Sequence, residues 1–130
     1  DSNLRIENCQ SFVVSGNIFD RNPRYHYGDG PQAKLGIIVQ DSADGVLTGN
    51  AIHGTGDIPG AIQLKNCRGL NLTGNSIYDP KAAAIVLDNV RGSRISGSLI
   101  RISADSPAIV EKNSGPNQIT DNLIDAKQPE

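Results

Sequence analysis

The chain has 130 residues, of which 37% are apolar, and 14 Asp and Glu residues against 12 Lys and Arg residues give a formal net charge of -2. This length suits a single domain, and the near-neutral charge argues against general nucleic-acid binding, which needs a concentrated basic surface. No apolar run reaches the length of a membrane span, and the first residues lack the basic and apolar regions of a signal peptide.

A Thr-Gly-Asn triplet, with substitutions, recurs five times along the chain. The copies are Ser15-Gly16-Asn17, Thr48-Gly49-Asn50, Thr73-Gly74-Asn75, Ser96-Gly97-Ser98 and Thr120-Asp121-Asn122. Their last residues are 33, 25, 23 and 24 positions apart. Repetition at this period indicates stacked supersecondary units that share one core.

Each repeat contains three short apolar segments in the same order. In the third repeat they are residues 61–65, 70–73 and 76–78, within which apolar and polar residues alternate. Alternation of this kind is typical of strands, and the segments are too short for amphipathic helices. Three strands per coil, each paired with its counterpart in the next coil, predict an all-β fold: a parallel β-helix of five coils, about 24 Å tall at a spacing of about 4.8 Å.

The apolar positions predict the register between coils. The first segments carry Leu4 and Ile6, Ile37 and Val39, Ile62 and Leu64, Ile85 and Leu87, and finally Ile109 followed by Glu111. The residues two positions after the triplets are Phe19, Ile52, Ile77, Ile100 and Ile124. We expect these last five to form a single interior file, and Glu111 departs from the apolar pattern.

Eight of the twelve Asn residues occupy two repeated turn positions. One row contains Asn8, Asn66, Asn89 and Asn113, and the other contains Asn17, Asn50, Asn75 and Asn122. Asn tolerates the left-handed conformation of a sharp bend, and stacked amides can hydrogen-bond along the column. We therefore expect an asparagine ladder with a structural role, in preference to contacts with a ligand or glycan.

Both cysteines fall in one row, because Cys9 follows Asn8 and Cys67 follows Asn66. Ser42 takes the same place in the coil between them, so the two thiols lie about 9.6 Å apart. A disulfide cannot span that separation. We expect two free, largely buried thiols without a metal or catalytic role.

These rows resemble the right-handed parallel β-helix repeats of the pectate lyase-like (pectin lyase-like) superfamily, over roughly Leu4 to Asp125. The resemblance implies a right-handed β-helix and an association with carbohydrate. It does not identify one activity, because the superfamily includes polysaccharide lyases, glycoside hydrolases, uronan epimerases, phage tailspikes and adhesins. The Gly-His-Gly motif of polygalacturonases and the Asp-Pro-His-Asp motif of alginate epimerases do not occur. Whether the chain is an enzyme therefore stays open.

The longest link between coils, residues 20–31, holds several candidate ligand-binding residues. Tyr25 and Tyr27 could stack on sugar rings, His26 could carry a proton, and Arg24 could neutralise an acidic sugar. The alternative is that the tyrosines hold the link against the column. The resemblance implies that a cleft borders this link and the shorter one at residues 53–59, and loops on a rigid scaffold often carry function.

The outward residues of the first segments form a second candidate surface. In successive coils they are Glu7, Gln40, Lys65, Asp88 and Lys112. Such residues can bind sugar hydroxyls or a uronate, or they can form cross-strand ion pairs, such as one between Lys65 and Asp88. Catalytic residues are not assigned. The candidate substrate-binding residues are Arg24, Tyr25, His26, Tyr27, Gln40, His53, Lys65 and Asp88.

We expect no metal or other cofactor, although calcium stays open. Asp20, Asp29 and Asp57 are hard oxygen donors, but they form no Asp-x-Asp calcium repeat. The expected ligand is a polysaccharide or oligosaccharide, and no nucleic acid or membrane span is expected.

The ends of the predicted column lack a capping helix. A solenoid otherwise exposes apolar layers and free strand edges at its ends. We therefore expect residues 1–130 to form one β-helix domain that is a fragment of a longer β-helix, or whose ends neighbouring subunits cover.

Three functions remain, all in an extracellular or cell-envelope protein: part of a polysaccharide lyase or glycoside hydrolase, a non-catalytic polysaccharide-binding module, or a structural stalk, tailspike-like or adhesive segment.

Overall fold

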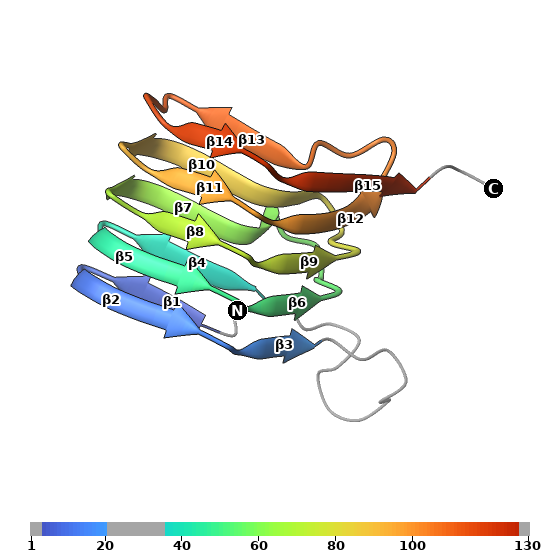
Figure 1. The fold of residues 1–130 in the computed structure, drawn as a ribbon, viewed down its shortest axis with the longest axis horizontal. Helices are drawn as coiled ribbons and strands as arrows, with labels where there is room; N and C mark the ends of the chain where they lie inside the picture. The colour runs from blue at the N-terminus through green and yellow to red at the C-terminus, as the bar shows by residue number, and fades with distance from the viewer. Residues whose placement is uncertain (1–3, 21–35, 128–130) are drawn as a thin grey trace.

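The computed structural model describes residues 4–20 and 36–127, which form strands and no helix (Figure 1). The first strand of each coil is β1 (Leu4–Glu7), β4 (Ile37–Gln40), β7 (Gly60–Arg68), β10 (Ala83–Arg91) or β13 (Ile109–Lys112). The second is β2 (Gln10–Ser15), β5 (Ala43–Thr48), β8 (Asn71–Thr73), β11 (Arg94–Ser96) or β14 (Gln118–Thr120). The third is β3 (Ile18–Asp20), β6 (Ala51–His53), β9 (Ser76–Tyr78), β12 (Leu99–Ser103) or β15 (Leu123–Lys127). Three strands in each of five layers confirm the predicted parallel β-helix.

The coils stack in sequence order, from coil 1 (blue in Figure 1) to coil 5 (red), and every strand pair is parallel. First and second strands belong to one ten-stranded sheet, because β7 and β10 continue through the bend between the two rows. The third strands form a separate five-stranded sheet. No helix long and apolar enough to cross a membrane occurs in residues 4–20 and 36–127.

The predicted interior file exists. Phe19, Ile52, Ile77, Ile100 and Ile124 are Cα partners from coil to coil. Ile52, Ile77 and Ile100 are almost fully buried, whereas Ile124 is 42% exposed. The difference follows from position, since no described coil covers the outer side of coil 5. Burial of this file and of the matching residues in the first and second strands provides the main stabilisation of the stack.

The outer Asn row, at the bend after the first strands, adopts the predicted left-handed conformation. Its members Asn8, Asp41, Asn66, Asn89 and Asn113 have φ between 49° and 56°. The inner Asn row, formed by Asn17, Asn50, Asn75, Ser98 and Asn122, does not, so this part of the prediction is wrong. There the preceding residues Gly16, Gly49, Gly74, Gly97 and Asp121 have φ from 58° to 68°. Because these residues make the turn, the Asn side chains after them are free to hydrogen-bond inside the column.

The inner Asn row is a hydrogen-bonded ladder. Asn17 Nδ2 donates to Asn50 Oδ1 at 3.2 Å, and Asn50 Nδ2 donates to Asn75 Oδ1 at 3.1 Å. The amide of Asn75 also donates to the carbonyl of Leu47 at 2.9 Å. Asn50 and Asn75 are 1% exposed, so these bonds satisfy polar groups that would otherwise be buried without a partner.

Candidate ligand-binding groove

Four predicted ligand-binding residues, Arg24, Tyr25, His26 and Tyr27, lie outside the described residues. Of the others, Gln40, Lys65 and Asp88 occupy one outward row of the first strands, with Glu7 before them and Lys112 after them. The register of this row is as predicted. Its role in binding a ligand stays a prediction.

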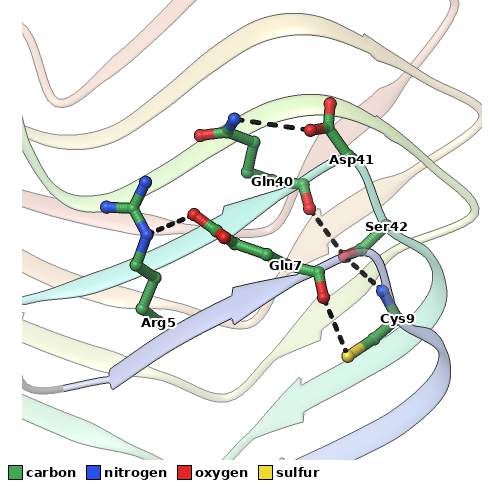
Figure 2. A network of polar contacts seen from close by, with 6 residues as sticks. All are labelled: Arg5, Glu7, Cys9, Gln40, Asp41 and Ser42. Atoms are coloured by element: carbon green, nitrogen blue, oxygen red, sulfur yellow. Dashed lines mark hydrogen bonds and ion pairs between the residues drawn. The ribbon is translucent and has the colours of Figure 1, made fainter.

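The predicted ion pair between Lys65 and Asp88 does not form. In the part of the chain that the structure describes, ion pairs join Arg5 to Glu7 and Arg101 to Asp79. The Arg5–Glu7 pair links two outward side chains of the same strand, β1 (Figure 2). The side chains of Lys65 and Asp88 are therefore not committed to each other, although their backbones are neighbours in adjacent coils.

His53 lies in the other sheet, away from this row. It is the last residue of β6, and its Cα partners are Asp20 and Tyr78 in the third strands. The rings of His53 and Tyr78 meet edge to face, with centroids 5.5 Å apart at 67°. His53 therefore does not lie beside Lys65 and Asp88. A binding site shared by His53 and Lys65 has no support among the described residues.

Arg101 contacts both Tyr78 and Asp79 on the outside of the third strands. Its guanidinium carbon lies 4.9 Å from the centroid of the Tyr78 ring, and Nη2 donates to Asp79 Oδ2 at 2.9 Å. The hydrogen bond to Asp79 raises the pKa of Arg101 above its ordinary value. A guanidinium held by both a ring and a carboxylate is a packed structural contact on the outside of the third strands.

A concave surface lies at the bend between first and second strands, and the sequence analysis did not predict it. We call it the bend groove. It has a volume of about 560 Å³ and is open to solvent. Its lining comes from four coils: Asn8, Cys9, Gln10, Asp41, Ser42, Ala43, Asn66, Cys67, Arg68, Asn89 and Arg91. A polar groove that crosses several stacked coils can contact successive units of an extended polymer.

The outer Asn row lines this groove with the amides of Asn8, Asn66 and Asn89 and the carboxylate of Asp41. Asn66 Nδ2 donates to Asp41 Oδ1, and Asn89 Nδ2 donates to Asn66 Oδ1, both at 3.0 Å. Asp41 Oδ2 also accepts a longer bond, 3.4 Å, from Gln40 Nε2 (Figure 2). Each internal bond orients an amide and leaves part of its hydrogen-bonding capacity toward solvent.

Two arginines supply positive charge at one end of the bend groove. Arg68 and Arg91 are Cα partners at the ends of β7 and β10, so they lie about one strand spacing, ~4.8 Å, apart. Arg91 Nη1 donates to the carbonyl of Gly115 at 3.3 Å. The exposed guanidinium of Arg68 has no protein partner among residues 4–20 and 36–127. An Asn-x-Arg motif in two adjacent repeats, Asn66 to Arg68 and Asn89 to Arg91, is the sequence signal for this pair.

The thiols of the groove differ in exposure. Cys67 is buried, as predicted, but Cys9 is exposed, so the prediction of two buried thiols is wrong for Cys9. Cys9 lies in coil 1, and no described coil covers the outer side of coil 1. Its backbone amide donates to Ser42 Oγ at 3.1 Å (Figure 2). Burial raises the pKa of the Cys67 thiol, which also bonds the carbonyls of Lys65 and Val39. At neutral pH Cys67 is therefore a small, protonated core residue.

Comparison with known proteins gives one family. Residues 1–128 match the family described as "Periplasmic copper-binding protein (NosD)". No curated protein matches the chain, and no solved structure matches it.

The described residues do not fit a copper site. Copper prefers thiolate, thioether or imidazole ligands, but the chain contains no Met, its two Cys lie in coils 1 and 3, and His53 lies on the other sheet. No group of three or more His, Cys, Asp or Glu residues that could hold a metal ion occurs in residues 4–20 and 36–127, which applies equally to calcium at Asp20 and Asp57. His26 and Asp29 lie outside the described residues. The match over nearly the whole sequence, together with the stacked parallel coils, shows that the chain belongs to the NosD family, a right-handed parallel β-helix family of the pectin lyase-like superfamily.

Proposed function

We propose that this chain is a non-catalytic, carbohydrate-binding segment of a cell-envelope β-helix protein, and that it holds a polysaccharide in the bend groove. One observation carries the proposal: the groove places amide side chains from three coils and the carboxylate of Asp41 from the fourth in one row, and adds the neighbouring guanidinium groups of Arg68 and Arg91. The family's description as periplasmic supports a place in the envelope.

The chemistry of the groove suits a hydroxylated polymer. Amides both donate to and accept from sugar hydroxyls, and a guanidinium can bind a carboxylate through two parallel hydrogen bonds. The outward row of Gln40, Lys65 and Asp88 lies on the first strands that lead into the bend, so it extends the same polar surface. Repetition at one strand spacing lets several weak contacts act on a single chain of sugars.

A non-catalytic role is favoured over a lyase or hydrolase. Proton transfer to or from a sugar needs an acid or base within hydrogen-bond reach of the reacting group. Among the described residues His53 is the one histidine, and it packs against Tyr78 on the third strands. A structural or adhesive segment without a small ligand is the alternative, and the binding experiment below separates the two.

The test is calorimetric titration of the folded chain with neutral and uronate oligosaccharides. We expect binding that Arg68→Ala weakens at least about tenfold for uronates, equivalent to about 1.4 kcal/mol. Lys81→Ala is the matched control, because Lys81 is exposed in the link between β9 and β10 and does not line the groove. Equal losses in both variants, or no binding of any glycan, would contradict the proposal. Appearance of unsaturated products or new reducing ends would favour an enzyme instead.

A further inference from the structure

The two end layers of the column differ in chemistry. The inward side chains of coil 1 are Leu4, Ile6, Cys9, Phe12, Val14, Asn17 and Phe19. Those of coil 5, in the corresponding files, are Ile109, Glu111, Ser114, Asn117, Ile119, Asn122 and Ile124. One file that is apolar in coils 1 to 4 thus ends in Glu111 at coil 5, where Ser114 and Asn117 are polar as well, whereas coil 1 places two aromatic rings in its layer.

Polar residues interrupt the apolar layer of coil 5, although Ile124 in that layer is 42% exposed. Glu111 continues the file of Leu64 and Leu87, and its Oε1 accepts a hydrogen bond from Asn117 Nδ2 at 3.2 Å. Asn117 Nδ2 also donates to the carbonyl of Val90 at 3.0 Å. A further coil stacked on this end would bury the carboxylate of Glu111, which is costly without a charged partner. Inward charges of this kind protect a sheet edge from further pairing.

The end formed by coil 1 is apolar and hollowed. A hollow of about 390 Å³ is lined by Leu4, Val13, Val14, Ser15, Asn17 and Phe19. Leu4, Ile6, Val14 and Phe19 are only half-buried, although Ile37, Val39, Leu47 and Ile52 beside them in coil 2 are buried. Apolar surface left this way is an unfinished layer of the core.

The asparagine ladder has a direction, and it is incomplete at coil 1. From coil 2 onward, the side-chain amide oxygens of the inner Asn row accept hydrogen bonds from the coil before. Asn50 Oδ1 accepts from Asn17, and Asn75 Oδ1 accepts from Asn50. Asn122 Oδ1 likewise accepts from the backbone of Ser98. Asn17 Oδ1 has no donor among residues 4–20 and 36–127, so it offers the acceptor that a preceding coil would use.

We propose that the face of coil 1 is an interface for one more coil of the same repeat, contributed by the same polypeptide ahead of Leu4. That coil would cover the hollow with apolar side chains and donate an amide to Asn17 Oδ1. A second copy of the chain fits less well, because the described part of coil 1 has the 17 residues from 4 to 20, and stable interfaces between separate proteins use about 20–30 residues a side. A tethered coil avoids most of the entropy cost of association.

The test is an extended chain in which a copy of residues 60–84, one full coil, replaces residues 1–3. Leu4 then follows the copied Ala84, as Ile85 does in the original sequence, so the register between coils is kept. We expect hydrogen exchange of the coil 1 amides to slow at least tenfold and the unfolding midpoint to rise. The matched control carries the same extension with the copied Ile62, Leu64 and Leu72 changed to Ser, which cannot pack, and should leave exchange in coil 1 unchanged.

Three outcomes would overturn the proposal. The first is an extended chain whose coil 1 amides exchange as fast as those of the control. The second is a stable dimer of the unextended chain by light scattering, with coil 1 protected, since a second copy would then cover the face. The third applies even if the extension fails to fold: coil 1 amides of the unextended chain that exchange as slowly as those of coil 3 would mean that this chain already covers the face.

Discussion

The ring of Phe12 occupies the space that a side chain at Gly45 would fill. The two residues are Cα partners in coils 1 and 2, and an ideal Cβ on Gly45 would lie 2.1 Å from Phe12 Cζ and 2.4 Å from Cε1. In coil 3 the same position holds Leu70, which is 1% exposed. Phe12 therefore fills one core position for two coils, and the missing side chain of Gly45 makes this possible.

Gly45→Ala should destabilise the protein by about 1–3 kcal/mol, because the added methyl group overpacks a filled space. Gly45 is not among the residues with positive φ, so backbone strain does not add to this cost. The measurement is the free energy of unfolding in urea. The control is the same substitution in a Phe12→Ala background, where we expect little loss or a gain. An equal penalty in both backgrounds would show that the contact with Phe12 is not its cause.

Asn75→Ala should be among the most destabilising substitutions of a polar residue, by about 3 kcal/mol. It removes the acceptor for the backbone and side-chain amides of Asn50 and the donor for the carbonyl of Leu47. Each buried group left without a partner costs about 1–3 kcal/mol. Thermal and urea unfolding measure the effect.

The control for Asn75 is Asn66→Gly in the outer Asn row. Asn66 is exposed, and its left-handed backbone, with φ 53°, suits Gly. We expect a loss below about 1 kcal/mol, since exposed amides can bond water instead. Similar losses at both positions would contradict the distinction between a buried ladder and an exposed row in the bend groove.

The register could be predicted from the sequence because each inward file repeats one kind of side chain. Ile52, Ile77 and Ile100 stand at one offset from their triplets, and a strand slipped by one residue would turn them all outward. The same argument located the outward row that contains Lys65 and Asp88. The repeats therefore predicted strands, their order and their pairing.

The bend groove and the place of His53 could not be predicted in this way. A groove depends on the angle at which β7 and β10 turn, which no repeat of residue types encodes. His53 comes one residue after Ile52 in the third strands, so the sequence could predict the sheet that contains it. The distance between His53 and Lys65 could not be predicted, because it depends on the angles between the strands of a coil. The left-handed residue of the inner turn was misassigned because Gly and Asn stand next to each other in every triplet and both tolerate positive φ.

Ser98→Asn should stabilise the protein by about 0.5–2 kcal/mol, in the range of substitutions that complete a local motif. Ser98 stands where the other four coils have Asn, and its hydroxyl is buried without a hydrogen-bond partner. An Asn side chain would accept from the amide of Asn75 and donate to a carbonyl of the same coil 3, as Asn75 does with Asn50 and Leu47 of coil 2. Unfolding in urea measures the gain, and Ser98→Ala, which only removes the unpaired hydroxyl, is the control. A loss of stability in Ser98→Asn would mean that coil 4 has no room for the longer side chain.

The buried thiol of Cys67 should make stability depend on alkaline pH. Desolvation raises its pKa in the folded protein, while the weaker hydrogen-bond contributions lower it. The folded state therefore holds this proton more tightly than the unfolded state, so the stabilising contribution is complete below the ordinary thiol pKa of about 8.5 and is lost as pH rises above it.

Cys67→Val isolates this effect, because Val90 occupies the same position in the next coil and shows that the site accepts its shape. The free energy of unfolding should fall between pH 8 and 10 more steeply in the wild-type chain than in Cys67→Val, whereas Cys9→Ser should follow the wild type. Thiol titration of the folded chain should meanwhile show one fast group, Cys9, and one slow group that reacts only on unfolding. Parallel pH profiles for the wild type and Cys67→Val, or two fast thiols, would contradict the burial of Cys67 between coils 2 and 4.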